Sequence, residues 1–333
     1  MNARHCFLML LPLCVAMGSA GAAVASKAPS HSMAAKPKPK RATRGVPGNV
    51  RNDVPPVHLT PPEEVPVLRF GTAGLGPGQM TKVALVTVDP NGFIYTGDTD
   101  AGRVMRFTPE GKFESLFFIE NPKGPWTGLA ADRAGAVYVA SGGRLFRYEG
   151  ASGKLLGEIQ HPDGAGFFHV APRPDFGVLA SWRNAQRDDF VLVGKDGTVE
   201  TIHRNAVTGA SGEPAGDVLV AMDGQRTIYA AVNHLHAVCL FKFTGEYVNR
   251  FGSDGDEDGQ FSGAIAGLTA DGQGQIFVTD AKGVSVLKSE DGSFVRRLEV
   301  KGTGIAIDDD DALFAAAGTE VAKYRVPPPP KKD

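Results

Sequence analysis

Residues 250–280 read RFGSDGDEDGQFSGAIAGLTADGQGQIFVTD, and the opening frame of this stretch occurs twice in the chain. Residues 70–80 repeat it as FGTAGLGPGQM. In both copies Phe-Gly opens the segment, a Gly stands at the fifth place, and Gly-Gln precedes a large apolar residue at the eleventh. Two copies of one frame in a single chain indicate a repeat protein.

The second half of the same stretch recurs more often. It is an Asp-containing turn followed by an aliphatic and then an aromatic residue, and copies begin at Asp89, Asp132, Asp223, Asp271 and Asp308. A degenerate copy lies at residues 177–179. The six aliphatic anchors, which follow one another at intervals of 37 to 50 residues, are Ile94, Val137, Val178, Ile228, Ile276 and Leu313. Units of about 40–50 residues with several short strands each predict an all-β fold, a six-bladed β-propeller.

These motifs together resemble the NHL-repeat family. The resemblance rests on Phe-Gly, the Gly-rich turn, the Asp-x-x-Gly turn and Arg103-Val104 before a third strand, and it covers roughly residues 65–326. The sequence departs from it at Ala237-Val238 and Gly283-Val284, where Arg-Val is expected. The resemblance implies a propeller of NHL-type repeats and says little about function.

The two ends of the repeat region predict how the ring closes. The last repeat has only three strands. The four prolines that follow, Pro327 to Pro330, cannot donate backbone hydrogen bonds and so cannot form a fourth strand. Residues 65–70 (VPVLRF) match residues 246–251 (EYVNRF), an outer strand of an internal repeat. We therefore expect the N-terminal strand to complete the last blade and to cover its open edge.

The remaining segments predict export. Arg4, the apolar residues 6–17 and Ala23-Val24-Ala25 indicate a signal peptide over residues 1–25. Residues 26–64 form a basic, Pro-rich linker, residues 65–326 the propeller, and residues 327–333 a Pro/Lys tail. The expected location is the periplasm or the outside of the cell. No other run is long enough to span a membrane.

Charge divides the chain into a basic arm and an acidic body. Residues 1–51 hold eight basic residues and no acidic one, whereas residues 52–330 carry a net charge of −11. An acidic body argues against nucleic-acid binding by the propeller. The arm is either a contact for anionic surfaces or a solubilising spacer. We expect a monomer whose partner is a protein or a glycan.

Candidate ligand-binding residues gather in the loops that open one face of a propeller, where loops vary over a rigid scaffold. The candidates on that face are Trp126, Trp182, Arg183, Arg187, Asp98, Asp100 and Arg103. Trp126 either stacks a ligand or plugs the channel. Arg183 and Arg187 suit carboxylates or a partner surface, or else form an Arg–Asp network with Asp188 and Asp189.

Metal binding is a weaker prediction, and no cofactor is expected. His234 and His236, two residues apart, would need a third ligand such as His169 to hold zinc. The spacing of Asp254, Asp256 and Asp258 resembles the first half of a calcium-binding loop. Such a loop has Glu at its twelfth position, where this chain has Ile265. The resemblance gives these residues weight, because some six-bladed lyases and hydrolases carry zinc or calcium on the propeller axis.

No motif for covalent catalysis is present in the sequence. The leading interpretation is therefore a non-catalytic binding module for a protein, peptide or glycan. The first alternative is a metal-dependent propeller lyase or hydrolase that uses the axial face. The second is a structural spacer anchored by its basic arm.

Overall fold

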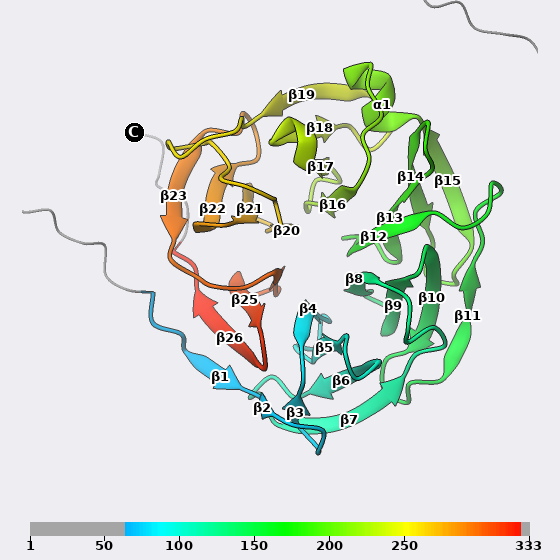
Figure 1. Ribbon diagram of the computed structural model, residues 1–333, viewed down its shortest axis with the longest axis vertical. Helices are drawn as coiled ribbons and strands as arrows, with labels where there is room; N and C mark the ends of the chain where they lie inside the picture. The colour runs from blue at the N-terminus through cyan, green and yellow to red at the C-terminus, as the bar shows by residue number, and fades with distance from the viewer. Residues whose placement is uncertain (1–63, 328–333) are drawn as a thin grey trace, which may run out of the picture. The chain divides into compact units, whose positions relative to one another are not determined.

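Residues 64–327 are the part of the chain that the computed structural model describes, and they form a ring of six blades around a central axis (Figure 1). Each blade is a four-stranded antiparallel sheet, and successive strands run from the axis to the rim. The predicted all-β, six-bladed propeller is confirmed. The segments predicted as signal peptide, linker and Pro/Lys tail lie almost entirely outside the described residues.

In the first three blades the strands follow one another along the chain from the axis outward. Blade 1 consists of β4 (Val83–Val88), β5 (Ile94–Asp98), β6 (Arg103–Phe107) and β7 (Phe113–Phe118). Blade 2 consists of β8 (Trp126–Ala131), β9 (Ala136–Ser141), β10 (Arg144–Glu149) and β11 (Leu155–Ile159). Blade 3 consists of β12 (Phe167–Pro172), β13 (Val178–Arg183), β14 (Asp188–Val193) and β15 (Val199–Arg204).

The other three blades are built from the axis outward in the same way. Blade 4 consists of β16 (Val218–Met222), β17 (Ile228–Val232), β18 (Ala237–Phe241) and β19 (Tyr247–Phe251). Blade 5 consists of β20 (Gly267–Ala270), β21 (Gln275–Asp280), β22 (Gly283–Lys288) and β23 (Phe294–Leu298). Blade 6 consists of β24 (Gly304–Ile307), β25 (Ala312–Ala317), β26 (Glu320–Arg325) and β1 (Leu68–Phe70). A short parallel pair, β2 (Thr72–Ala73) and β3 (Gln79–Met80), lies between β1 and blade 1 in the chain.

Burial explains the composition of the strands. The middle strands β17 and β18 are buried at every position, whereas four of the five residues of the outermost β19 are exposed. The apolar core is divided into six clusters, and each joins two neighbouring blades. Because every blade shares its core with the next one, the ring is held together by packing between blades.

The recurring Asp-containing turns join the first two strands of a blade, as predicted. The Oδ1 atom of Asp89 accepts the backbone N–H groups of Asn91 (2.9 Å) and Phe93 (3.0 Å). Its Oδ2 atom accepts the hydroxyl of Tyr95 at 3.2 Å. In this copy one carboxylate thus fixes both the turn and the tyrosine six residues after it, and Asp132 with Tyr138 and Asp223 with Tyr229 repeat the contact.

Blade 6 takes its outer strand from the N-terminal side of the described chain. Strand β1 pairs antiparallel with β26, and Leu68 lies opposite Lys323 and Phe70 opposite Val321. Phe70 is 9% exposed, and its ring centroid lies 4.7 Å from that of Phe107 in blade 1. The first and last blades therefore share one core cluster.

One helix, α1 (Ala206–Ser211), was not expected from the sequence. The carboxylate of Asp188 accepts the backbone N–H groups of Val207 (2.9 Å) and Thr208 (2.7 Å) at the start of this helix. A tertiary contact thus satisfies the free N–H groups of a segment that has no amphipathic pattern of its own. None of the helices formed by residues 64–327 combines the length and apolar character that a membrane crossing requires.

Candidate functional site

An axial channel runs between the innermost strands of the six blades, five of which are labelled around the centre of Figure 1 (β4, β8, β12, β16 and β20). Its central part has a volume of about 110 Å³. The wall is mostly aliphatic, and Thr127 and His169 are polar residues within it. A largely apolar cavity with a few placed polar groups is the usual form of a small-molecule site. We call the end where the innermost strands begin the upper mouth, and the other end the basal mouth.

His169, on β12, is the imidazole of the channel wall. Its Nδ1 atom accepts the backbone N–H of Val220, on the neighbouring innermost strand β16, at 3.2 Å. Because a neutral imidazole has one acceptor nitrogen, this contact puts the ring proton on Nε2. Among the described residues, no atom makes a hydrogen bond with Nε2. His169 thus presents an N–H donor in the channel wall that the protein itself does not use.

Burial keeps this imidazole neutral. Desolvation lowers the pKa of His169 to about 4, and the hydrogen bond from Val220 opposes this shift only in part. The ring is therefore uncharged at neutral pH. An uncharged N–H donor in a poorly solvated channel is suited to stabilising an oxygen atom that gains negative charge.

Close packing of neighbouring strands fixes the position of this donor. A Cβ atom on Gly128 of β8 would lie 2.8 Å from the backbone nitrogen of Val170 and 3.2 Å from the Cα atom of His169. Glycine lets the two innermost strands approach each other at this point. The Oγ1 atom of the adjacent Thr127, which is shielded from solvent, has no hydrogen-bond partner within the described part of the chain. A buried hydroxyl without a partner is unusual and marks a place for a water or ligand atom.

The upper mouth carries an aromatic residue and an ion pair. Phe168, next to His169, lies under the guanidinium of Arg183, whose Cζ atom is 5.7 Å from the ring centroid. The Nε atom of Arg183 pairs with Asp217 Oδ1 at 2.5 Å. Both charged side chains are about half exposed. Arg183 lies at the end of β13 and is paired with Asp217, a residue that the sequence did not single out; its role in ligand binding stays a prediction.

Two other predicted ligand residues, Asp98 and Arg103, lie in a buried network. Asp98 is fully buried and accepts hydrogen bonds from Thr81, Lys82 and Arg103. Burial alone would raise the pKa of Asp98, but these hydrogen bonds outweigh burial and hold the pKa below its usual value. Arg103 also donates to the carbonyl oxygens of Leu75 (2.7 Å) and Gln79 (2.8 Å). The pair ties the loop of β2 and β3 to blade 1.

The exposed Asp100 and the aromatic Trp126 stand apart from that network. Asp100 lies 3.7 Å from the Nζ atom of Lys82, and both side chains are exposed. The indole of Trp126 packs in the cluster between blades 1 and 2, 3.4 Å from the position of a Cβ atom on Gly97. Trp126 thus packs between two blades and is not part of the wall of the central channel, and its stacking on a ligand stays a prediction.

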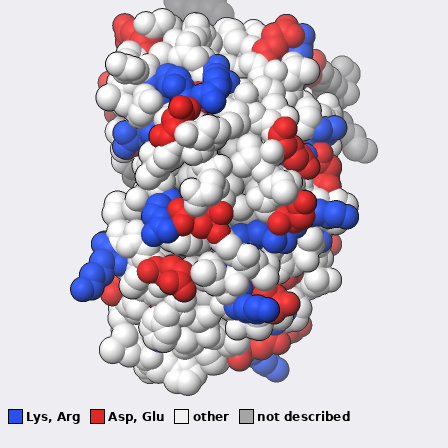
Figure 2. Space-filling model, turned by 90° about the vertical axis from the view of Figure 1, so that its right-hand side faces the viewer, with Lys and Arg blue, Asp and Glu red and all other residues white. Residues whose placement is uncertain are grey.

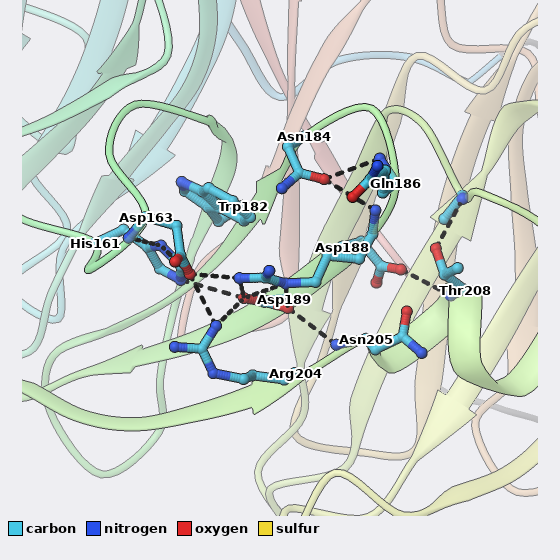
Figure 3. A network of polar contacts seen from close by, with 12 residues as sticks. His161, Asp163, Trp182, Asn184, Gln186, Asp188, Asp189, Arg204, Asn205 and Thr208 are labelled. Carbon is cyan, nitrogen blue, oxygen red and sulfur yellow. Dashed lines mark hydrogen bonds and ion pairs between the residues drawn. The ribbon is translucent and has the colours of Figure 1, made fainter.

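Trp182 belongs to a cluster on blade 3 that Figure 3 shows from close by, and the guanidinium of Arg187 lies 5.1 Å from the centroid of its ring. Trp182 is 1% exposed and stacks on His161 with ring centroids 4.0 Å apart. Two carboxylates, those of Asp163 and Asp189, face the guanidinium groups of Arg187 and Arg204. This is the Arg–Asp network that the sequence left open as an alternative, enlarged by residues that the sequence did not single out.

The cluster contains one group of residues spaced closely enough to hold a metal ion. One ligand atom from each of its members lies within 4.8 Å of the others; the members are His161, Asp163 and Asp189. The hydrogen bonding, however, does not fit a divalent cation. The Nδ1 atom of His161 accepts the N–H of Asp163 at 3.2 Å, so the proton lies on Nε2, which faces Asp189 Oδ2 at 3.2 Å. Neither nitrogen then has a free lone pair for a metal. The positive charges of Arg187 and Arg204 already neutralise both carboxylates.

We therefore predict that chelation leaves this cluster unchanged. Incubation with EDTA, or addition of zinc, should shift the melting temperature by less than about 1 °C, because a metal that bound the native state would stabilise it. Fluorescence of Trp182 in a Trp126→Phe background should also stay constant, since its ring stacks directly on His161. A chelator-induced drop in melting temperature together with a change in this fluorescence would contradict the assignment.

Among the described residues, no three of the histidines and carboxylates predicted from the sequence as metal ligands form one metal-type group. His234 lies on the short helix η1 (Asn233–Leu235), and His236 follows it with its Nδ1 atom 3.5 Å from Asp254 Oδ1. Asp256 pairs with Lys282 at 2.8 Å. Asp258, like Asp254 and Asp256, is not part of any metal-type group found among the described residues. His169 belongs to the channel wall on blade 3.

Comparison with known proteins supports the fold. No protein-family model and no curated protein matches the chain. Among 1093 matching solved chains is an X-ray structure described as a candidate gluconolactonase. It matches with a TM-score of 0.57 and 17% sequence identity, over 81% of this chain and 97% of that chain. At this identity the likeness shows the fold alone.

This comparison corrects the leading interpretation from the sequence. A non-catalytic binding module was predicted first, but the solved propeller that matches most of the chain bears the name of an enzyme. The alternative, a propeller enzyme with its site on the axis, is the one that the comparison favours. The sequence-based interpretation relied on the absence of a local catalytic motif, and a site assembled from several blades leaves no such motif.

Proposed function

We propose that this protein is a hydrolase that opens a lactone, or cleaves another small ester, at the upper end of its axial channel. The observation that carries the proposal is the Nε2–H donor of His169, whose tautomer is fixed by Val220 and whose pKa lies at about 4. The name of the matched propeller, a candidate gluconolactonase, supports this reaction class.

The proposed chemistry assigns a role to two polar groups of the channel, His169 and Thr127. The carbonyl oxygen of the ester accepts the Nε2–H of His169, which stabilises the negative charge that forms when water attacks the carbonyl carbon. The Oγ1–H of Thr127 is a second donor in the same wall. The bond from the carbonyl carbon to the alkoxy oxygen then breaks. The proton released by the attacking water ends on that oxygen, so a lactone and water give a hydroxy acid.

The size of the channel limits what enters it. A cavity of about 150 Å³ holds benzene, and the central channel measures about 110 Å³. Only the reacting carbonyl end of a substrate fits inside. The remainder would lie at the upper mouth, against Phe168 and the partly exposed Arg183.

Two further expectations belong to the proposal. The signal-like residues 1–25 support export, so the substrate would be met in the periplasm or outside the cell. The turn motifs support a relation to NHL-type repeats within the propeller class. Metal is not assigned a step, because the one His/Asp group found among the described residues is occupied by hydrogen bonds and arginines.

The experiment is a hydrolysis assay on a panel of five- and six-membered lactones and short-chain esters, with the released acid followed by pH-stat titration. We expect turnover above the uncatalysed rate for at least one substrate, and its loss in the His169→Ala variant. The His234→Gln variant, which changes an exposed histidine outside the channel, is the matched control. Absence of turnover across the panel, or turnover that survives His169→Ala, would reject the proposal.

A further inference from the structure

The side of the ring formed by blades 2 and 3 carries interspersed positive and negative side chains, as Figure 2 shows. Mixed charge of this kind does not single out a docking surface for a charged partner. The feature that sets blade 3 apart lies inside, next to the axis. Its innermost strand β12 carries His169, and the next strand, β13, places Ser181 opposite this histidine. Ser181 is 2% exposed.

The hydroxyl of Ser181 joins two backbones. Its Oγ atom accepts the backbone N–H of His169 at 3.0 Å. The same hydroxyl donates to the carbonyl oxygen of Val218 at 2.7 Å. Val218 begins β16 in blade 4 and lies two residues before Val220, whose N–H donates to His169 Nδ1. One serine thus connects the backbone that carries the imidazole to the strand that fixes its tautomer.

Strand β16 can accept these contacts because it is the innermost strand of its sheet. It pairs with β17, and its axial edge has no strand beside it in the described sheet. Backbone groups two residues apart point the same way from a strand, so the carbonyl of Val218 and the N–H of Val220 are offered together. Ser181 takes the carbonyl and His169 takes the N–H. The two side chains therefore bind the same short piece of β16.

A β-bulge beside His169 gives Ser181 its task. The pairing of β12 with β13 shifts between Phe167 and His169, and the register skips Phe168. A bulge disrupts the ladder locally and re-aims the side chains next to it. The hydroxyl of Ser181 receives the N–H of His169 at the point where the register changes. Ser181 thus fixes the backbone of the histidine where the ladder is weakest.

The other blades show that the fold does not require a hydroxyl at this place. Blades 1 and 2 have the same bulge, with Gly97 and Ala140 at the position of Ser181. In all six repeats this position is the third residue after the aliphatic anchor, and its occupants from blade 1 to blade 6 are Gly97, Ala140, Ser181, Ala231, Thr279 and Ala316. The hydroxyl of Thr279 is buried and has no hydrogen-bond partner within residues 64–327. The hydroxyl that bridges two backbones belongs to the blade that carries the channel histidine.

We propose that Ser181 is the positioning residue of the axial channel. Its hydroxyl holds the backbone of His169 against β16, so that Nδ1 stays on Val220 and the Nε2–H donor keeps its place in the wall. Ser181 is not among the described residues that line the central channel, so it acts through His169 and does not touch a substrate. Its effect on a reaction rate rests on the proposed hydrolase function, whereas its effect on the imidazole does not.

The first part of the test measures the imidazole in the full chain without a substrate. The nitrogen NMR signals of His169, identified by their absence in His169→Gln, report which ring nitrogen carries the proton. We expect a protonated Nε2 and an acceptor Nδ1 in the wild type. In Ser181→Ala the two signals should move toward each other, because a ring released from Val220 shares its proton between both nitrogens. The control is Ser141→Ala, which removes a buried hydroxyl bonded to the carbonyl of Asn121 at 2.8 Å in blade 2 and should leave the signals unchanged.

The second part follows hydrolysis of the best lactone or ester. Ser181→Ala should lower kcat roughly 10- to 100-fold, since a displacement of about 1 Å costs up to ~10²-fold. KM should stay nearly unchanged, because the lost interaction is one made in the transition state. Ser181→Thr keeps the hydroxyl in a side chain that the same position holds in blade 5, and it should restore most of the rate. Ser141→Ala should keep its kcat although it loses a buried hydrogen bond.

Unchanged nitrogen signals in Ser181→Ala would overturn the proposal. So would a loss of kcat of equal size in Ser141→Ala, or shifted signals in Ser181→Ala with an unchanged kcat. Shifted signals in a protein that hydrolyses nothing in the panel would reject the proposed function and still support the role of Ser181 in holding the imidazole. If Ser181→Ala does not fold, Ser181→Cys takes its place with the same expected shifts, because a thiol has a similar shape and is only a weak donor.

Discussion

Removal of residues 1–70 should lower the free energy of unfolding by several kcal/mol, whereas removal of residues 1–63 should change it little. The longer deletion takes away β1, which pairs with β26 over Leu68, Arg69 and Phe70. Phe70 packs against Phe107 and fills space beside Gly111, where a Cβ atom would lie 2.8 Å from its ring. Replacement of a buried Phe by Ala alone costs roughly 3–5 kcal/mol, a large part of a typical stability of ~5–15 kcal/mol.

Urea unfolding of the two truncated chains measures this difference. Within the full chain, Phe70→Ala should reproduce much of the loss, and Val67→Ala, at a side chain that is 53% exposed, is the matched control. The longer deletion also leaves the edge of β26 without its partner, so aggregation should accompany the loss. Equal unfolding midpoints for the two truncations would show that β1 contributes nothing to ring closure.

Replacement of His169 by Ala should lower kcat for the best lactone or ester about 10²–10³-fold, the range found when one donor to a developing oxyanion is removed. His169→Gln keeps an N–H donor of different reach and should retain part of the rate. Both variants should still unfold cooperatively at pH 8, with a lower melting temperature in His169→Ala because the buried N–H of Val220 loses its acceptor. A loss of rate in His169→Ala that matches the loss in His234→Gln would remove the histidine from the mechanism.

The pH dependence of the unfolding free energy tests whether the imidazole of His169 is neutral in the folded protein. The pKa of His169 is about 4 in the folded protein, below the value of ~6.5 for an unperturbed His. Between these values the unfolded chain binds more protons than the folded one, so stability should rise as pH increases from 4 to 6.5. This slope should be smaller in His169→Gln. The contribution of the neutral Nε2–H donor of His169 to the hydrolysis rate should stay constant above about pH 5.

The fold was predictable because it repeats. Each Asp turn satisfies the same backbone N–H groups, as Asp89 does, so the same residue types recur at blade intervals. The outer strand of the last blade was also visible, since residues 65–70 copy an outer strand from elsewhere in the chain. Helix α1 was missed because its N-terminal support comes from Asp188, a tertiary contact that no local pattern contains.

The site was harder to predict because its groups come from different blades. His169 was considered only as a third metal ligand, and its pairing with Val220 depends on how blades 3 and 4 meet. Thr127 has no sequence signal at all. Asp98 and Arg103 stood at positions typical of exposed loops, but they are buried by the loop of β2 and β3. His161 and Asp163 were overlooked, since their cluster forms only when Arg187 and Arg204 fold over it.

The most direct test of the account is a crystal structure of the protein soaked with the hydroxy acid that its best lactone substrate releases. We predict density for the product at the upper end of the axial channel, with a carboxylate oxygen about 2.7–3.2 Å from the Nε2 atom of His169. The body of the product should lie against Phe168. A product bound at another face of the propeller, with the channel wall unchanged, would contradict the assignment of the channel as the active site.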